Sequence, residues 1–427
     1  MEPYSRPSTH SVISTRPVRT RHELIDSLRG FALFGVFLVN LTYLSLYAFL
    51  PEEQQEHLIT AGSDRVVAAL MTWLVDIKAI TVFSLLFGLG FALQMERTDT
   101  ASTRRYVRRM LVLAVIGAIH GWFIWWGDIL LTYAVVGLLL LPFRHASARM
   151  LIGSGLVCAL LLPPLLLPWI RPLMQGFPRS NDVYAQALQA FGADSWSVAL
   201  FQNIFTAQWA RTTNWALLLF VLGRFLLGYW AGRVGLLQHP RQHHKLLWRL
   251  FLGSLVVGLW AMLVEAFQAD LRAEFPLLNS ELGRYVTRVI QRTAPLAVGI
   301  AWACGFVLLY LLPSAQRWLS KLAPVGRMAL TNYLLQSIVG VALFYGIGLG
   351  VGPRYGLIAV TLVGVMVFSL QAIASYWWLR RFHFGPVEWL WRSLTYGLRP
   401  AWRKTGGHID GEASSSAVSS AIEMENR

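Results

Sequence analysis

Residues 28–44 read "LRGFALFGVFLVNLTYL", an apolar run with Arg29 near its start and Asn40 near its end. About 20 apolar residues in a helix cross the roughly 30 Å hydrocarbon core of a bilayer, so this run predicts a membrane-spanning helix. At roughly 100° per residue, Arg29 and Asn40 fall on nearly the same helix face, about 16 Å apart along the axis. A polar side chain is costly in hydrocarbon, so each one requires a partner or a role.

The composition extends this reading to the whole chain. Of the 427 residues, 55% are hydrophobic and only 14% are charged, which predicts an all-α polytopic membrane protein. The net charge of +15 comes from short basic clusters between apolar runs, so we expect no nucleic-acid partner. Cys158 and Cys304 lie inside apolar runs with no companion at ligand spacing, and we expect neither a disulfide nor a metal site.

Ten apolar runs reach or approach the length of a span. They lie at about 29–49, 66–95, 108–126, 128–143, 150–169, 213–232, 246–266, 294–313, 327–349 and 356–378. The second run contains Asp76 and Lys78, so it is either a broken helix or an interfacial helix joined to a span. Lys and Arg gather between alternate runs, which predicts about ten spans with both termini cytoplasmic; nine or eleven spans are the alternatives.

These runs suggest a division of the chain into membrane and non-membrane parts. We expect a basic disordered tail at 1–27, an N-terminal bundle of about five spans at 28–169, an extracytoplasmic loop at 170–212, a C-terminal bundle of about five spans at 213–382, a cytoplasmic interfacial helix at 383–404 and a disordered tail at 405–427. Amphipathic stretches in the 170–212 loop suggest that it covers the bundle or a site. Gly228 and Gly232 have the GxxxG spacing of close helix packing.

Several polar residues are expected at a similar depth, toward the outer side. His120 precedes Asp128 by eight residues across a presumed turn, close enough for the carboxylate to orient the imidazole. Together with Asn40, Asp76 and Lys78, this pair predicts a buried cluster with a general base, an amide donor and a cation. The alternatives are structural: Asn40 bridges two helices, His120 is a core residue, and Asp76 and Lys78 form a local ion pair.

Three further residues lie inside predicted spans. Arg224 is in the middle of the sixth run, where it cannot easily reach either interface, and we expect it to face a cavity or an anion. Asn332 and Gln336 are four residues apart on one face of the ninth run. They either line the same cavity or form an interhelical hydrogen-bonded pair. Asp26 and Arg29, three residues apart, are placed to form an ion pair.

Five blocks of sequence carry a resemblance to a known family. They are "IDSLRGFALFGVFLVN", "FSLLFGLGFALQ", "HGWFIWWGDILLTYAVVGLLLLPF", "GRMALTNYLLQSI" and "GPVEWLWRSLTYG". In this order they resemble the YeiB-like bacterial inner-membrane proteins, whose C-terminal half is a domain of unknown function. The first block also resembles the opening span of heparan-α-glucosaminide N-acetyltransferase and related transmembrane acyltransferases.

This wider resemblance implies acyl transfer. An acetyl or other acyl group would pass from cytoplasmic acyl-CoA to an extracytoplasmic small-molecule or glycan acceptor, with Asn40 on the acyl carbonyl. The histidine of the acetyltransferase follows its asparagine in the first outer segment, where this chain offers only His57; the sequence favours His120, oriented by Asp128. Binding of acyl-CoA is assigned to Arg29, Lys78, Arg224 and Asn332.

Other functions fit the same pattern. Buried charges, a long outer loop and two halves of about five spans also suit a secondary transporter of a small molecule. A non-catalytic scaffold is a third reading. The lipid bilayer is the expected environment, and assembly into a homo-oligomer is left open by the sequence.

Overall fold

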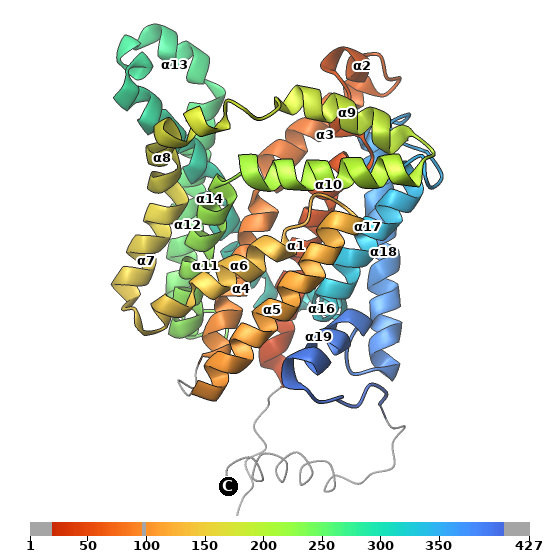
Figure 1. Ribbon diagram of the computed structural model, residues 1–427. Helices are drawn as coiled ribbons and strands as arrows, with labels where there is room; N and C mark the ends of the chain where they lie inside the picture. Colours follow the sequence, from red (N-terminus) through yellow and green to blue (C-terminus); the bar gives the residue numbers. More distant parts are fainter. Residues whose placement is uncertain (1–18, 96–99, 405–427) are drawn as a thin grey trace, which may run out of the picture.

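The structure is a computed structural model that describes residues 19–95 and 100–404, and it is a bundle of helices (Figure 1). In hydrocarbon each backbone N–H and C=O must find its partner within the chain, so long apolar runs become helices. The first part contains α1 (Arg19–Leu44), η1 (Tyr47–Phe49), α2 (Glu52–Glu56), α3 (Ala61–Leu70), η2 (Met71–Val75), α4 (Lys78–Gln94), α5 (Thr100–Phe123), α6 (Leu130–Leu139), η3 (Leu141–His145), α7 (Ala148–Leu156), η4 (Val157–Leu161), α8 (Leu162–Ile170) and η5 (Pro172–Met174).

The second part is equally helical. It contains α9 (Ser180–Gly192), α10 (Trp196–Thr213), α11 (Ala216–Val234), α12 (His244–Ala266), α13 (Gln268–Glu274), η6 (Pro276–Asn279), α14 (Glu281–Tyr310), α15 (Pro313–Leu319), η7 (Ser320–Leu322), α16 (Ala323–Arg327), α17 (Ala329–Phe344), α18 (Leu357–Arg381) and α19 (Pro386–Tyr396). Within the described residues, the only extended pairing is an isolated bridge between Phe382 and Arg403.

The all-α polytopic fold is therefore confirmed, and the chain is a multi-pass membrane protein. Among the described residues, eight helices are long and apolar enough to cross a membrane, or nine if the bent pair α15–α16 and α17 counts as one span. The fourth predicted run, at 128–143, corresponds to α6, which has only 10 residues. Each run thus corresponds to a helical segment, although α6 is shorter than a span requires.

Two of the spanning segments are interrupted. The run that contains Asp76 breaks between η2 and α4, where Ile77 takes a left-handed conformation with φ of 59°. The broken-helix interpretation of this run is correct. The second interruption is at Met328, where the chain bends by 78° between α16 and α17. Such breaks free the backbone groups at a helix end, which then require other partners.

The two predicted halves are interleaved. Helix α4 from the first half packs along α11 from the second, with Gly88 against the Phe225 carbonyl and Gly228 against the Leu85 carbonyl. Helix α1 packs on α16, where Gly326 lies against the carbonyl of Asp26. The loop at 170–212 therefore does not separate two packing units, and Gly228 has the packing role that its spacing predicted.

The bundle has two distinct ends. Helices α9 and α10 lie crosswise over one end, the α10 face, and α19 lies under the opposite end, the α19 face (Figure 1). The 170–212 segment covers the bundle as predicted, and most of it is helical. Helix α1 begins at Arg19, before the predicted boundary at residue 27, and α19 is shorter than the predicted 383–404 helix. The predictions for residues 1–18 and 405–427 lie outside the described residues.

Candidate functional site

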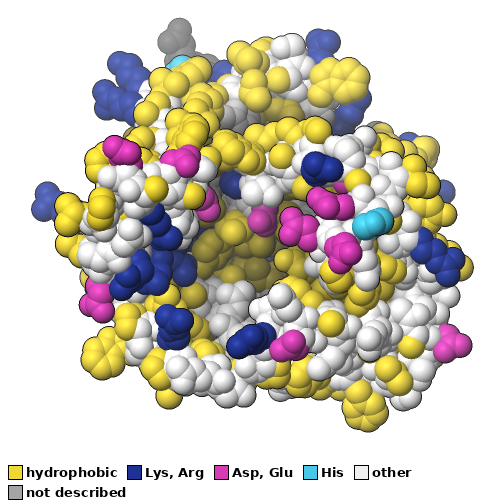
Figure 2. Space-filling view, turned by 90° about the horizontal axis from the view of Figure 1, so that it is seen from above, with side chains coloured by type: hydrophobic (Ala, Val, Ile, Leu, Met, Phe, Trp, Pro, Cys, Tyr) yellow, Lys and Arg dark blue, Asp and Glu magenta, His cyan; other side chains and the backbone are white. Residues whose placement is uncertain are grey.

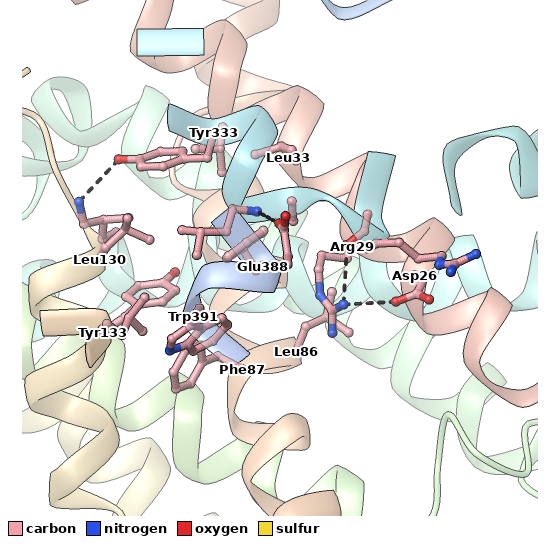
Figure 3. Close-up of a pocket in the computed structure, with 18 of the residues that line it drawn as sticks. Asp26, Arg29, Leu33, Leu86, Phe87, Leu130, Tyr133, Tyr333, Glu388 and Trp391 are labelled. Atoms are coloured by element: carbon pink, nitrogen blue, oxygen red, sulfur yellow. Dashed lines mark hydrogen bonds and ion pairs between the residues drawn. The ribbon is translucent and has the colours of Figure 1, made fainter. Parts of the chain in front are cut away.

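A cavity of about 420 Å³ lies inside the bundle between α1, α4, α5, α6, α17 and α19. One end holds charged side chains near α19, and the other holds Asn40. Its lining residues include Asp26, Arg29, Leu33, Val36, Asn40, Phe83, Phe87, Arg109, Gly127, Ile129, Leu130, Tyr133, Arg327, Tyr333, Glu388, Trp391 and Arg392 (Figure 3). The cavity thus joins a charged end to a polar end through an apolar middle.

Helix α1 supplies one wall from end to end. Arg29, Leu33, Val36 and Asn40 follow one another at spacings of three and four residues, and all four line the cavity. Arg29 donates to Asp26 at 3.0 Å, the ion pair predicted from their spacing, and to the carbonyl of Gly326 at 3.5 Å. The Asn40 amide makes no hydrogen bond within the described residues. It is therefore free to bind a ligand in the cavity.

His120 and Asp128 form a buried pair near the Asn40 end. The imidazole Nδ1 lies 2.9 Å from Asp128 Oδ1, and both side chains are almost fully buried. Asp128 Oδ2 accepts from the N–H of Leu131, in the first turn of α6. The carboxylate is thereby fixed by a helix end, and in the neutral tautomer that donates to it from Nδ1, the lone pair of the ring is on Nε2. Nε2 is buried and has no partner within the described residues.

Tyr333 connects this pair to the cavity. Its ring centroid lies 5.2 Å from that of His120, and its hydroxyl accepts from the N–H of Ile129 at 3.4 Å. Tyr333 and Ile129 line the cavity, as does Gly127 on the other side of Asp128. Asn40 and the two neighbours of Asp128 in the chain thus line one cavity, whereas His120 and Asp128 are not among its lining residues; a shared site stays a prediction.

Basic residues gather at the opposite end of the cavity. Arg29, Arg109, Arg327 and Arg392 line it, against the carboxylates of Asp26 and Glu388. The Arg109 guanidinium lies 4.1 Å from the Trp391 ring centroid, and its Nε is buried without a partner in the described part of the chain. Trp391 in turn donates its indole N–H to the Arg109 carbonyl. This excess of cations, held by an aromatic ring, suits a phosphate-bearing ligand.

Glu388 of α19 occupies the helix end exposed by the bend at Met328. Its Oε1 accepts from the N–H groups of Leu330 at 2.7 Å and Thr331 at 3.0 Å, and Oε2 accepts from the Thr331 hydroxyl at 2.5 Å. A carboxylate at a helix N-terminus is favoured by the unpaired amides and the helix dipole. Burial nevertheless raises the pKa of Glu388 above its ordinary value of 4.5. This contact fixes α19 beneath the cavity.

Glu388→Gln is expected to stabilise the protein increasingly as the pH rises. A raised pKa means that this carboxyl favours the folded state below its unfolded pKa of about 4.5 and loses that contribution as the pH rises through its folded pKa. The glutamine oxygen can still accept from the Leu330 and Thr331 amides, and its NH2 can donate to the Thr331 hydroxyl, but the side chain does not titrate. Unfolding midpoints of variant and wild type, measured from about pH 4 to 8, should therefore diverge; the exposed Glu281→Gln is the control, and a constant difference for Glu388→Gln contradicts the expectation.

Two predicted ligand-binding cations do not line this cavity. Lys78 donates to the Thr72 carbonyl instead of pairing with Asp76, and it borders a smaller cavity behind α1. Arg224 is buried, with Nε donating to Thr81 at 2.8 Å and Nη1 to the Phe220 carbonyl at 3.0 Å. Of the predicted outward cluster of five polar residues, Asp76 and Lys78 do not line this cavity, because Lys78 faces the smaller cavity on another side of α1.

Two other predictions are decided by hydrogen bonds between α17 and α18. The Asn332 amide donates to Ser375 at 3.0 Å, and Gln336 donates to Gln371 at 2.9 Å. The interhelical alternative is therefore correct, and Asn332 does not line the cavity. His57 is exposed and bonds to the Glu53 carbonyl of its own helix, so it has no place at this site.

Comparison with known proteins places the chain in a family. A protein of Bacillus subtilis (strain 168) named "Uncharacterized protein YxaH" is 32% identical over 418 residues, which cover 92% of this chain and 99% of that protein. "Uncharacterized protein YeiB" of Escherichia coli (strain K12) is 28% identical over 405 residues, covering 90% of this chain and 99% of YeiB. The chain belongs to the YeiB-like family. Residues 231–398 match the family described as "Protein of unknown function (DUF418)", and no solved structure matches the chain.

Sequence reasoning did not single out Tyr333 or Glu388 of this YeiB-like protein, and it considered Arg109 only as one member of the basic group at 97–109, either a topology signal or an aid to phosphate binding. Arg109 stands 11 residues before His120 on α5, the same spacing as Arg29 and Asn40 on α1. Both helices thus place an arginine about three turns from a polar residue on one face, and this repeated spacing was a usable signal for Arg109. Tyr333 and Glu388 carried no such signal, because their roles depend on contacts with distant segments.

Proposed function

We propose that this protein is a transmembrane acyltransferase of the bacterial inner membrane. An acyl-CoA, with acetyl-CoA the simplest donor, enters from the cytoplasm at the α19 face, and the acceptor arrives at the α10 face. The observation that carries this proposal is the cavity with a basic end at Arg29 and Arg109 and a polar end at Asn40, beside the buried pair of His120 and Asp128.

The dimensions and lining of the cavity support a long, thin donor. Phosphates of CoA would bind the arginines, and its flexible arm would lie along the apolar middle, where Phe83, Phe87 and Leu33 line the wall. The arm would place the thioester near Asn40, about 16 Å along α1 from Arg29. The donor and the acceptor would then approach His120 from opposite ends of the bundle.

The site has groups for each step of direct transfer. His120 Nε2 takes the proton of an acceptor hydroxyl or amine while that oxygen or nitrogen attacks the thioester carbon. The Asn40 amide donates to the carbonyl oxygen as negative charge develops on it. The carbon–sulfur bond then breaks, and the thiolate takes the proton from the imidazolium. Asp128 holds the ring and stabilises its charged form throughout.

Asn40→Leu and Arg29→Gln are expected to affect different kinetic constants. Removal of a donor to the developing oxyanion lowers kcat about 10²–10³-fold, so Asn40→Leu should act on kcat. Arg29→Gln removes one charge from the basic end and should raise KM for acetyl-CoA about tenfold. Transfer of radiolabelled acetyl from acetyl-CoA to hydroxyl and amine acceptors measures both constants.

The matched control for Arg29 is Arg317→Gln, an exposed arginine of α15. Its KM should equal that of the wild type. If acetyl-CoA neither binds nor turns over with any acceptor tried, the acyltransferase proposal is wrong. If Arg29→Gln and Arg317→Gln raise KM equally, the basic end is not the donor site.

A secondary transporter is the second candidate. Its support is the pair of interrupted spans, at Ile77 and Met328, since discontinuous helices form the binding sites of many transporters. In this chain, however, Glu388 already occupies the free helix end at Met328. Uptake of labelled solutes by proteoliposomes, without turnover of acetyl-CoA, would favour this function.

A further inference from the structure

Unpaired hydrogen-bond donors gather at the α10 end of α5, outside the donor cavity. Seven buried nitrogen atoms in this region have no partner within the described residues: the indole Nε1 atoms of Trp122, Trp125 and Trp126, the Nε, Nη1 and Nη2 of Arg211, and Nε2 of His120. Six of the seven can only donate. Buried polar groups are normally satisfied, so such a concentration calls for an explanation.

Arg211 of α10 reaches this region from the segment that crosses the bundle. Asn203, two turns earlier on α10, donates to the carbonyls of Gly121 and Trp122 at 3.1 and 2.8 Å and so anchors the helix on the end of α5. A Cβ placed on Gly121 would lie only 2.1 Å from Arg211 Nη2 and 3.1 Å from Asp128 Cβ. The guanidinium therefore lies directly against the residue that follows His120.

The guanidinium of Arg211 forms no ion pair within the described residues, although Asp128 lies close enough to act on its charge. The Asp128 carboxylate itself is bonded to His120 and to the Leu131 amide. The Arg211 guanidinium carbon lies 5.9 Å from the Trp122 ring centroid, a contact that positions the cation without giving its N–H groups an acceptor. These N–H groups are left to bind the oxygens of an anion.

A second cavity borders α10 at Asn203, two turns from Arg211, and neither Arg211 nor Trp122 lines it. This cavity of about 280 Å³ between α10 and α17 is lined by Phe123, Ile124, Asn203 and Tyr345, among others. Asn203 Oδ1 and the Tyr345 hydroxyl are buried without partners in the described part of the chain. Figure 2 shows that the surrounding α10 face is hollowed near its centre, with hydrophobic side chains on the floor and charged ones at the rim.

We propose that Arg211 and Trp122 form an acceptor subsite that binds an anionic group, a phosphate or a carboxylate, carried by the molecule that His120 deprotonates. This inference rests on the proposed acyl transfer and names the class of its acceptor: an acidic, oxygen-rich alcohol or amine. A guanidinium and an indole N–H are donors that match the several acceptor oxygens of such a group. A neutral acceptor would leave the guanidinium unpaired.

The test uses the full-length protein in micelles, labelled with 5-fluorotryptophan. The fluorine signal of Trp122 is assigned by its loss in Trp122→Phe. Methyl phosphate and acetate are the probes, and methyl glucoside is the neutral control. We expect both anions to shift the Trp122 signal saturably and methyl glucoside to leave it unchanged.

Variants of the cation separate the subsite from general anion effects. Arg211→Gln should raise the Kd for methyl phosphate about tenfold or more, since it removes charge-assisted hydrogen bonds. Arg211→Lys keeps the positive charge and should raise this Kd by a smaller factor. It replaces Arg211→Gln in the test if the glutamine variant does not fold. Arg179→Gln, at an exposed arginine before α9, is the matched control and should bind like the wild type. Equal Kd values for Arg211→Gln and wild type, or no Trp122 shift with either anion, would overturn the proposal.

Nanodiscs distinguish two sources of the anion. If phosphatidylglycerol, but not phosphatidylcholine, shifts the Trp122 signal and prevents a further shift by methyl phosphate, the anion belongs to a lipid headgroup. A response to methyl phosphate in both lipids indicates a soluble acceptor. An anion-dependent shift of the Trp122 signal without any acyl transfer would support the anion subsite and contradict the acyltransferase function. Acyl transfer without a Trp122 response would support the acyltransferase function and contradict the subsite.

Discussion

His120→Ala is expected to lower the rate of acyl transfer from acetyl-CoA by about 10²–10⁴-fold, the usual contribution of a general base. The reason is structural: Nε2 is the only atom of the His120–Asp128 pair left without a partner in the described residues, and Tyr333 connects the ring to the donor cavity. Transfer is measured under single-turnover conditions with bound acetyl-CoA, so that a loss in the chemical step is separated from a loss of binding.

Two variants accompany this measurement. His57→Ala, at the exposed histidine that the acetyltransferase resemblance suggested, should transfer at the wild-type rate. Asp128→Asn should lower the rate of transfer, because a neutral amide stabilises the imidazolium less than a carboxylate does and no longer selects the tautomer with the proton on Nδ1. The amide oxygen of the variant can still accept from the Leu131 N–H. A full rate in His120→Ala, or the loss of activity in His57→Ala alone, would show that His120 is not the base.

Gly88→Ala and Gly228→Ala are each expected to lower the free energy of unfolding by about 1–3 kcal/mol. A Cβ on Gly88 would lie 2.0 Å from the Phe225 carbonyl oxygen, and one on Gly228 would lie 2.0 Å from that of Leu85. The obstacles are backbone atoms of the facing helix, so α4 and α11 must separate to admit a methyl group. Small residues allow this close approach between helices in a membrane.

Gly90→Ala provides the matched control on the same helix. Among the described residues, no atom outside its own stretch of helix lies within 4 Å of a Cβ built on Gly90, so the substitution should be neutral or gain up to about 1 kcal/mol from helix propensity. Denaturation with sodium dodecyl sulfate in mixed micelles measures all three variants. If Gly90→Ala destabilises the protein as much as Gly88→Ala, the close contact between α4 and α11 does not account for the effect.

Much of the site could be predicted from local sequence. The pairing of Asp26 with Arg29 follows from their separation by three residues, and the closeness of His120 and Asp128 follows from a short turn between two spans. The place of Asn40 on the same face as Arg29 follows from helix geometry. These relations all lie within one helix or one hairpin, where spacing alone determines which side chains share a face.

The remaining predictions depended on contacts between distant segments. Arg224 was a reasonable candidate for an anion site, but its partner is Thr81, 143 residues earlier. Asn332 bonds to Ser375 on the neighbouring span instead of a ligand. No spacing rule distinguishes a polar residue that faces a cavity from one that faces another helix, because both lie on a buried face.

The sequence by itself determined that this chain is an all-helical, multi-pass membrane protein, because apolar runs of this length must form helices where the backbone has no water to bond. Only the tertiary structure decided which polar residues share a cavity. Lys78 lines a different cavity, whereas Tyr333 and Glu388 line this one, because the place of each helix depends on the helices packed around it and not on local spacing.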